Sequence, residues 1–256
     1  MAIEITEVDK HQDWDELFAC FWTAWANPPQ VVGQLTFPHL GEGTGHESQS
    51  FRECKRLWLE ATINNPNDYW GKAVDTETLK IVGGVGITFH EESPPQEKIR
   101  AEWWEEGSEM RELAEEMFER ILEMRRVLDG NLTRISPFMS TDGYTAGERL
   151  WCLPAYRNKV VADKLVRWAT EKIDSRGVEA CLEATVFSKP VLQRYGFMPV
   201  RNAKMNFPKK DASEQWNRRV RELQEVPVCI MWRPRGGLLK EGETVIPGKE
   251  YPKAKL

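Results

Sequence analysis

The chain has 256 residues, of which 41% are hydrophobic and 29% are charged, and its formal net charge is −5. This composition is sufficient for a buried core and excludes a disordered chain, and the length predicts one large domain or one domain with insertions. The acidic balance argues against nucleic acid or an anionic membrane as a partner, so an anionic cofactor would need a local cationic patch.

Hydrophobic periodicity and turn residues predict the elements of the first half of the chain. In chain order they are a strand over 2–8, a helix over 12–26, a Pro-, Gly- and His-containing loop over 30–47, a helix over 48–63, a hairpin of strands over 70–74 and 81–90, a polar loop over 91–100, a helix over 107–128 and a loop over 130–147.

The second half has the order strand, loop, helix and strand over some 35 residues, which is typical of a βαβ unit within an α+β fold. Its predicted elements are a strand over 148–153, a loop over 154–159, a helix over 160–174, a strand over 178–185, a short helix over 189–195, strands over 197–205 and 226–233, and a polar helical segment over 211–225. We expect one domain over 1–235, with a helical insertion at about 100–130 and a tail over 236–256.

No segment reaches the roughly 20 apolar residues of a membrane-spanning helix, and the first residues alternate like a strand. We therefore expect a cytoplasmic protein that acts on a small molecule, with its oligomeric state left open. The five cysteines show no CxxC pair, which argues against a disulfide framework or a metal site.

Two further features have competing interpretations. The eleven tryptophans indicate either core filling or an aromatic-lined pocket for a bulky apolar substrate. Gly83, Gly84 and Gly86 lie within a strand pattern with no helix after it, so they predict a bulge or a close backbone approach rather than a dinucleotide site.

The loop that enters the helix over 160–174 is the best candidate for a phosphate site. The first turn of a helix presents free backbone N–H groups and the positive end of the helix dipole. Arg157 and Lys159 add two cations at that point. The alternative is that both are ordinary solvated charges before a helix.

Three consecutive pieces of the chain resemble fungal GNAT proteins, a superfamily of N-acetyltransferases. Leu150 to Trp168 resembles their acetyl-CoA segment, Gly177 to Thr185 resembles their Gly-x-x-x-x-Leu-Glu-Ala-Ser strand, and Lys189 to Phe197 resembles their Arg-Pro-Leu-Tyr-x-x-x-Gly-Phe segment. The resemblance implies an α+β fold with a mixed, mostly antiparallel central sheet flanked by helices.

The resemblance also implies acetyl-CoA as cofactor and an acyl-transfer activity. The residues that it places at the cofactor are Trp151, Cys152, Leu153, Arg157, Asn158, Lys159, Val160, Val161 and Ala162.

The sequence departs from the family at two positions. Val160 replaces the first glycine of the phosphate loop, and a β-branched residue is bulky and disfavours a positive φ. Leu192 replaces the tyrosine that commonly protonates the departing thiolate in the family, and leucine has no proton to donate. The loop thus keeps its positive charges and the helix dipole, but at Val160 it loses a glycine's freedom to adopt a positive φ.

Candidate acid and base groups are few. Glu148 opens the strand before the loop, Glu183 occupies the family's glutamate position, and either could deprotonate an ammonium, although both could be ordinary strand carboxylates. Tyr195 could replace the missing tyrosine, but three residues beyond Leu192 it is rotated by about 300° on a helix, so a core aromatic is the competing interpretation.

Three hypotheses follow. The first is that the chain is an acyl-CoA-dependent N- or O-acyltransferase for a small metabolite, which could be a bulky apolar one. Alternatively, a GNAT fold serves CoA-independent lyase, hydrolase or cyclase chemistry in secondary metabolism, which fits Val160, Leu192 and the tryptophans. The third hypothesis is a catalytically silent binding module.

Overall fold

A computed structural model describes residues 2–89, 98–126, 135–136, 149–157, 160–239, 244 and 246. Its strands are β1 Ile3–Glu7, β2 Asp68–Asp75, β3 Lys80–Phe89, β4 Ile135–Ser136, β5 Leu150–Cys152, β6 Ala180–Ala184, β7 Met198–Asn202 and β8 Cys229–Arg233. Its α-helices are α1 Trp14–Ala26, α2 Val31–Thr36, α3 Gly45–Asn64, α4 Glu109–Arg126, α5 Val160–Ser175, α6 Lys189–Arg194 and α7 Glu214–Glu225. Short 3₁₀ turns occupy Pro154–Tyr156 and Arg235–Gly237.

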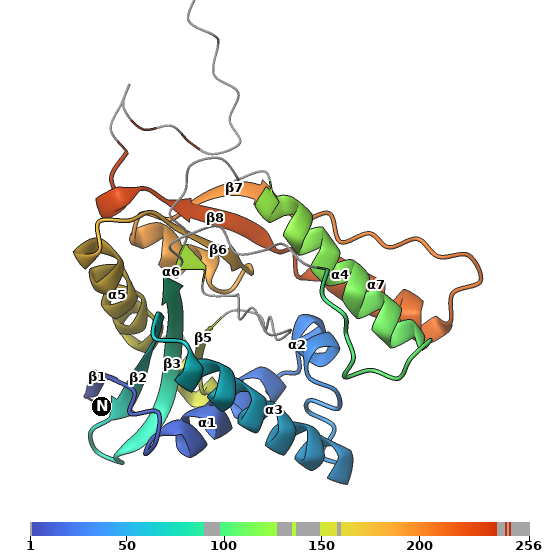
Figure 1. Ribbon diagram of the computed structural model, residues 1–256, viewed down its shortest axis with the longest axis horizontal. Helices are drawn as coiled ribbons and strands as arrows, with labels where there is room; N and C mark the ends of the chain where they lie inside the picture. The colour runs from blue at the N-terminus through green and yellow to red at the C-terminus, as the bar shows by residue number, and fades with distance from the viewer. Residues whose placement is uncertain are drawn as a thin grey trace, which may run out of the picture.

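The strands form two sheets rather than one continuous sheet. The first has the order β1-β2-β3, and β4 and β5 both pair with β3; the second has the order β6-β8-β7. Every strand pair in the described part of the chain is antiparallel, and none joins β5 to β6. The predicted α+β class is therefore confirmed, and the sheet divides where the sequence indicates a βαβ unit (Figure 1).

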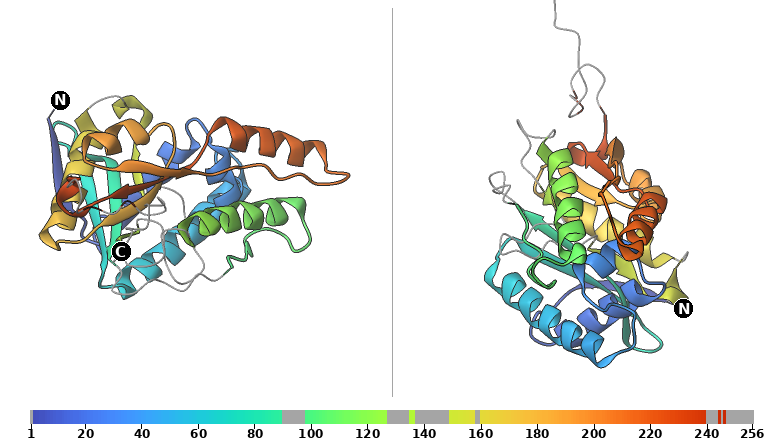
Figure 2. Two further views of the ribbon diagram at one scale, coloured as in Figure 1. Left: turned by 90° about the horizontal axis from the view of Figure 1, so that it is seen from above. Right: turned by 90° about the vertical axis from the view of Figure 1, so that its right-hand side faces the viewer.

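Helix α5 packs against both sheets. Its buried residues Val161, Leu165 and Ile173 belong to one apolar cluster with Val85 of β3 and Met231 of β8. On the other side of the first sheet, α1 and α3 cover an aromatic cluster. Helices α4 and α7 lie side by side away from the first sheet and share a third cluster with α2 (Figures 1 and 2).

The tryptophans are mainly core residues, as the first of the two interpretations predicts. Eight of them are buried: Trp14, Trp22, Trp25, Trp58, Trp70, Trp151, Trp216 and Trp232. Six of the eight belong to the cluster under α1 and α3, where T-shaped ring pairs are frequent. This aromatic layer fixes α1 and α3 against the sheet.

The predicted loop over 30–47 contains α2, which the sequence did not predict. Its six residues include Gly33, a weak helix former. A Cβ at Gly33 would lie 2.7 Å from the Trp25 ring, so the absence of a side chain lets α2 pack on α1. Tertiary packing thus overrides local propensity here.

Gly83 of β3 allows the close backbone approach that the pattern predicts, because a Cβ there would lie 2.7 Å from the backbone oxygen of Trp151. The other two glycines make room for side chains. A Cβ at Gly84 would lie 2.3 Å from the Trp151 ring, and one at Gly86 would lie 2.8 Å from Cδ of Arg149. β5 can therefore pair with β3 although the large side chains of Trp151 and Arg149 lie across β3.

A buried ion pair fixes the start of β5. Asp68 of β2 and Arg149 are 5% and 7% exposed, and Nη1 of Arg149 lies 2.6 Å from Oδ1 of Asp68. The Asp68 carboxylate also accepts hydrogen bonds from the hydroxyls of Thr62 and Thr88 and from the indole of Trp70. Each buried charge depends on the other, because an unpaired one would be costly.

We expect Asp68→Ala to lower the free energy of unfolding by about 3–5 kcal/mol, because it leaves the Arg149 guanidinium buried without its partner. Urea denaturation measures the loss. Arg56→Ala, which removes an ion pair to Glu60 with both side chains more than half exposed, should cost less than about 1 kcal/mol. A loss for Asp68→Ala no greater than that of Arg56→Ala would contradict this account of β5.

Candidate functional site

An open groove lies where the two sheets separate. Its volume is about 950 Å³, and its walls come from the α1–α2 connection, β5, the first turn of α5, the β6–α6 connection and the end of α7. Two tryptophans, Trp25 and Trp151, contribute to the lining. The groove therefore collects residues from both halves of the chain.

β5 lines the groove and presents backbone donors to the gap between the sheets. Leu153 N–H donates to Val82 O of β3, and Gly86 N–H donates to Arg149 O. Since N–H groups alternate in direction along an antiparallel strand, those of Leu150 and Cys152 point away from β3, toward β6. The Trp151 side chain packs in the aromatic cluster on the opposite face from Leu150 and Cys152.

The first turn of α5 forms another part of the groove. Val160 is the first helical residue and is 46% exposed, Val161 is buried, and Ala162 lines the groove. Because Val160 is helical, its valine side chain causes no φ strain at this position. The N–H groups of this turn lie beyond the reach of intrahelical acceptors. Asn158 and Lys159 lie outside the described residues.

The cations beside the groove already have protein partners. Nη2 of Arg157 donates to Ala24 O at 2.6 Å, near the carbonyl end of α1. Arg194 of α6 also lines the groove, and its Nη2 lies 3.0 Å from Oδ1 of Asp163. Two positive charges therefore flank the groove, and Asp163 partly offsets them.

Tyr195 points to α5 rather than into the gap. Its hydroxyl donates to Oδ2 of Asp163 at 2.8 Å. This hydrogen bond and that from Arg194 hold the pKa of the Asp163 carboxyl below its usual range. Leu192, in contrast, is buried at the gap, so Tyr195 does not take over the place of the family's tyrosine.

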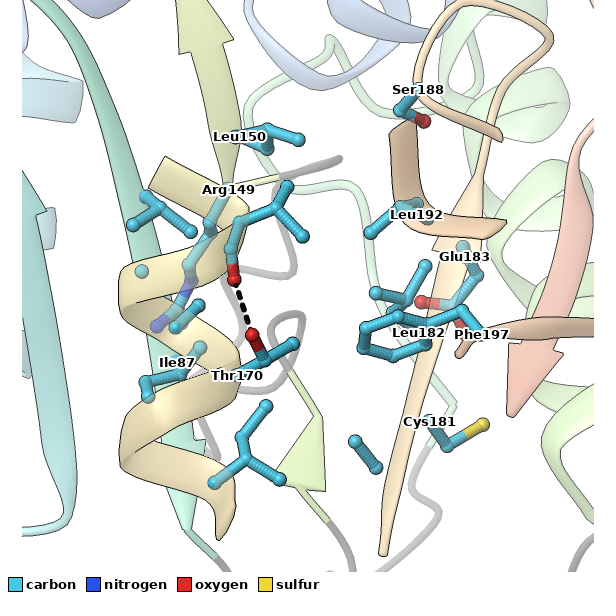
Figure 3. A pocket seen from close by; sticks show the side chains of 16 residues that line it. Ile87, Arg149, Leu150, Thr170, Cys181, Leu182, Glu183, Ser188, Leu192 and Phe197 are labelled. Atoms are coloured by element: carbon cyan, nitrogen blue, oxygen red, sulfur yellow. Dashed lines mark hydrogen bonds between the residues drawn. The ribbon is translucent and has the colours of Figure 1, made fainter. Parts of the chain in front are cut away.

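Below the groove, a narrow cavity of about 50 Å³ continues between β3, β5, α5, β6 and α6. Figure 3 shows Leu150 on one side and Leu192, Leu182 and Phe197 on the other. Glu183 also lines this cavity and is 4% exposed, in register with Ile230 of β8. The predicted base Glu183 thus lies at the gap, while Glu148 lies outside the described residues.

The structure brings Cys152, Arg157 and Ala162 together at one groove, and it places Glu183 at the narrow cavity below. Leu153 and Val161 support this arrangement through the β3 hydrogen bond and the core, respectively.

The groove is also lined by four residues that the sequence did not indicate, namely Asp163, Thr185, Ser188 and Arg194. Ser188 precedes Leu192 by four residues, and this helical spacing could have indicated that both face the same side.

No model of a known protein family matches the chain, and no curated protein matches it. Several solved structures share its architecture. A mosquito arylalkylamine N-acetyltransferase-like protein, 5b, is 10% identical with a TM-score of 0.55, over 91% of this chain and 99% of that one. The Drosophila melanogaster polyamine N-acetyltransferase is 12% identical with a TM-score of 0.57, over 90% of this chain and 99% of that one.

The C-terminal condensation domain of Ebony, solved with beta-alanyl-dopamine, is 12% identical with a TM-score of 0.57, over 91% of this chain and 99% of that one. At such low identity, these similarities concern the fold alone. The chain therefore has the fold of GNAT N-acetyltransferases, as its sequence predicts.

Proposed function

We propose that the chain is an acyl-CoA-dependent N- or O-acyltransferase that acts on a small metabolite. The observation that carries this proposal is the groove at the first turn of α5, which shares the lining residues Leu150 and Ser188 with the narrow cavity between β5 and β6. The N–H groups of Leu150 and Cys152 point away from β3 at this place.

The residues present fit an acyl-CoA. The N–H groups of Val160, Val161 and Ala162 would hold the pyrophosphate at the positive end of α5, and Arg157 and Arg194 would add charge beside it. Acyl-CoA supplies an activated thioester. The N–H groups of Leu150 and Cys152 would polarise its carbonyl, since donors fixed before the reaction stabilise negative charge that develops on oxygen.

The acceptor would approach from the wall formed by α1, α2 and α7. Trp25, Val31 and Val226 give this wall an apolar surface, and Glu225 gives it negative charge. Glu222 also lines it, but is paired with Arg219 at 2.9 Å. An apolar molecule that carries an amine suits both features, and two structural neighbours are named for arylalkylamine and polyamine acetylation. Glu183 and Glu148 are the proposed bases for the acceptor, directly or through water.

A second candidate is CoA-independent chemistry in the same groove. It is favoured by Leu192, which cannot donate a proton, and by the hydrogen bond that directs Arg157 to Ala24 O. The Ebony neighbour is named as a condensation domain rather than an acetyltransferase. Binding of acetyl-CoA separates the first candidate from CoA-independent chemistry and from a silent module, because neither of those needs acyl-CoA.

We expect the wild-type chain to bind acetyl-CoA, and we expect Val160→Asp to weaken that binding by about tenfold or more. The new carboxylate would stand at the turn that holds the phosphates. It would also be favourable for the helix itself, because negative charge stabilises a helix N-terminus, so weaker binding cannot be attributed to unfolding. Isothermal titration calorimetry measures both affinities.

Gln215→Asp is the matched control, since it adds the same charge to the exposed first turn of α7. It should leave the affinity unchanged. Absence of acetyl-CoA binding by the wild type would overturn the proposed function. Equal affinities of the wild type and Val160→Asp would mean that the phosphates do not bind at the first turn of α5.

Cys152 provides a chemical probe of the same groove. It is the partly exposed cysteine, whereas the other four are buried. We expect iodoacetamide to alkylate Cys152 first, and saturating acetyl-CoA to slow this reaction several-fold. Burial raises the pKa of the Cys152 thiol, so the rate should keep rising above a thiol's ordinary pKa of about 8.5.

Mass spectrometry of the labelled peptides identifies the site, and Cys152→Ser provides the blank. Equal labelling of Cys152 with and without bound acetyl-CoA would show that the ligand lies elsewhere.

A further inference from the structure

We propose that the narrow cavity between β5, α5 and β6 binds the acyl chain of the acyl-CoA, and that this chain is apolar and longer than acetyl. This inference rests on the proposed function and adds to it the chemical class of the acyl donor. Acetyl-CoA would still bind through its phosphates and its thioester, but it would leave most of the cavity empty.

The lining of this cavity is mainly apolar. Figure 3 shows the side chain of Leu150 on one side and those of Leu182, Leu192 and Phe197 on the other. The buried face of α5 adds Val166 and Ala169 to the lining. Side chains from several elements thus enclose a space that suits a hydrocarbon group.

The charged and hydroxyl-bearing side chains at the cavity already have protein partners. Arg149 is paired with Asp68 at 2.6 Å. The Thr170 hydroxyl donates to two carbonyls within α5. Glu183 and Ser188 also interact within the protein. The cavity therefore does not require a polar ligand, and an apolar chain could enter it without breaking these interactions.

The cavity has room for a short hydrocarbon chain. Its volume is about 50 Å³, whereas one water molecule needs roughly 10–15 Å³ of such space. Water in a cavity also needs roughly two to four polar partners, which a mainly apolar lining does not favour. A methylene group is similar in size to a water molecule, so the cavity fits about three or four carbon atoms. Acetyl has only one carbon beyond its carbonyl.

The cavity begins where the thioester would be held. It shares Leu150 and Ser188 with the groove, and the N–H groups of Leu150 and Cys152 point away from β3 there. The carbonyl carbon of a thioester is planar, so its sulfur and its acyl chain leave it in different directions. With the sulfur directed along the groove to the phosphates at α5, the acyl chain would be directed into the cavity.

Leu192 suits an acyl-chain site better than the family's tyrosine would. It is 5% exposed, and it lines the cavity beside Phe197. A tyrosine there would bring a hydroxyl that needs a hydrogen-bond partner among apolar groups. The leucine keeps this wall apolar, so its departure from the family pattern serves the choice of acyl donor.

Isothermal titration calorimetry of the full chain with free CoA, acetyl-CoA, butyryl-CoA and hexanoyl-CoA tests the inference. Each methylene group moved from water into an apolar site raises the affinity by about fourfold. Butyryl-CoA, which is two methylene groups longer, should therefore bind about tenfold more tightly than acetyl-CoA. Ala169→Leu fills the cavity from α5 and should abolish this preference. Free CoA puts no group into the cavity, so its affinity reports whether the groove is intact in the variant.

Leu182→Ala enlarges the cavity from β6 and should move the preference from butyryl-CoA towards hexanoyl-CoA. Ala61→Leu is the matched control for Ala169→Leu, because it adds the same side chain to α3, away from both the groove and the cavity. It should keep the chain-length profile of the wild type.

Equal affinities of the wild type for acetyl-CoA and butyryl-CoA would overturn the inference and leave the proposed function standing. A preference for butyryl-CoA that Ala169→Leu retains would overturn it too, because the chain would then lie elsewhere. If Ala169→Leu also loses free CoA, its groove is damaged and Leu182→Ala decides, since an unchanged profile in that variant overturns the inference. Failure of the wild type to bind any of the four ligands would overturn the proposed function together with the inference.

Discussion

The separation of β5 from β6 is the constraint on which the rest of the structure depends. β5 is short, and it is fixed on one side by its pairing with β3, by the buried Asp68–Arg149 ion pair and by Trp151 over Gly84. β6 is paired with β8 instead. Helix α5 packs against both sheets, through Val85 of β3 and Met231 of β8, and no pairing joins β5 to β6 in the described part of the chain. Under the proposed function, the backbone donors on this edge of β5 would bind the ligand.

The position of the groove follows from which parts of the molecule are densely packed. The aromatic cluster under α1 and α3 holds one face of the first sheet, and the α4–α7 pair is held by a separate cluster. The groove lies where α1, α2, β5, α5, α6 and α7 meet. Groups on such a fixed framework keep their orientation, which is what polarisation of a carbonyl and positioning of an acceptor require.

The sequence predicted the regular parts of the fold well, because a strong local pattern coincides with burial there. The helix predicted over 160–174 is observed over Val160–Ser175, and the strand predicted over 178–185 is observed over Ala180–Ala184. The two-sheet division was missed, since strand, helix and strand in sequence look the same whether or not the strands pair. α2 was missed because it is only six residues long and contains a glycine, and the cluster in which it buries Val31, Val32 and Leu35 is made with distant segments. The cofactor residues predicted from one contiguous motif, Cys152, Arg157 and Ala162, line the same groove, and their role stays a prediction. Contacts between separate segments, such as Arg157 with Ala24 O and Tyr195 with Asp163, have no signature in a single sequence.

Hydrogen exchange of the full chain with and without acetyl-CoA tests the central claim most directly, namely that the opening between the sheets holds an acyl-CoA. The account predicts slower exchange at the amides of Leu150 and Cys152 in β5, and of Val160 to Ala162 in α5, when acetyl-CoA is present, because those N–H groups would bond to the thioester carbonyl and the phosphates. It predicts unchanged exchange in α3. Unchanged exchange at both of the first two segments, or changes confined to α4 and α7, would contradict it.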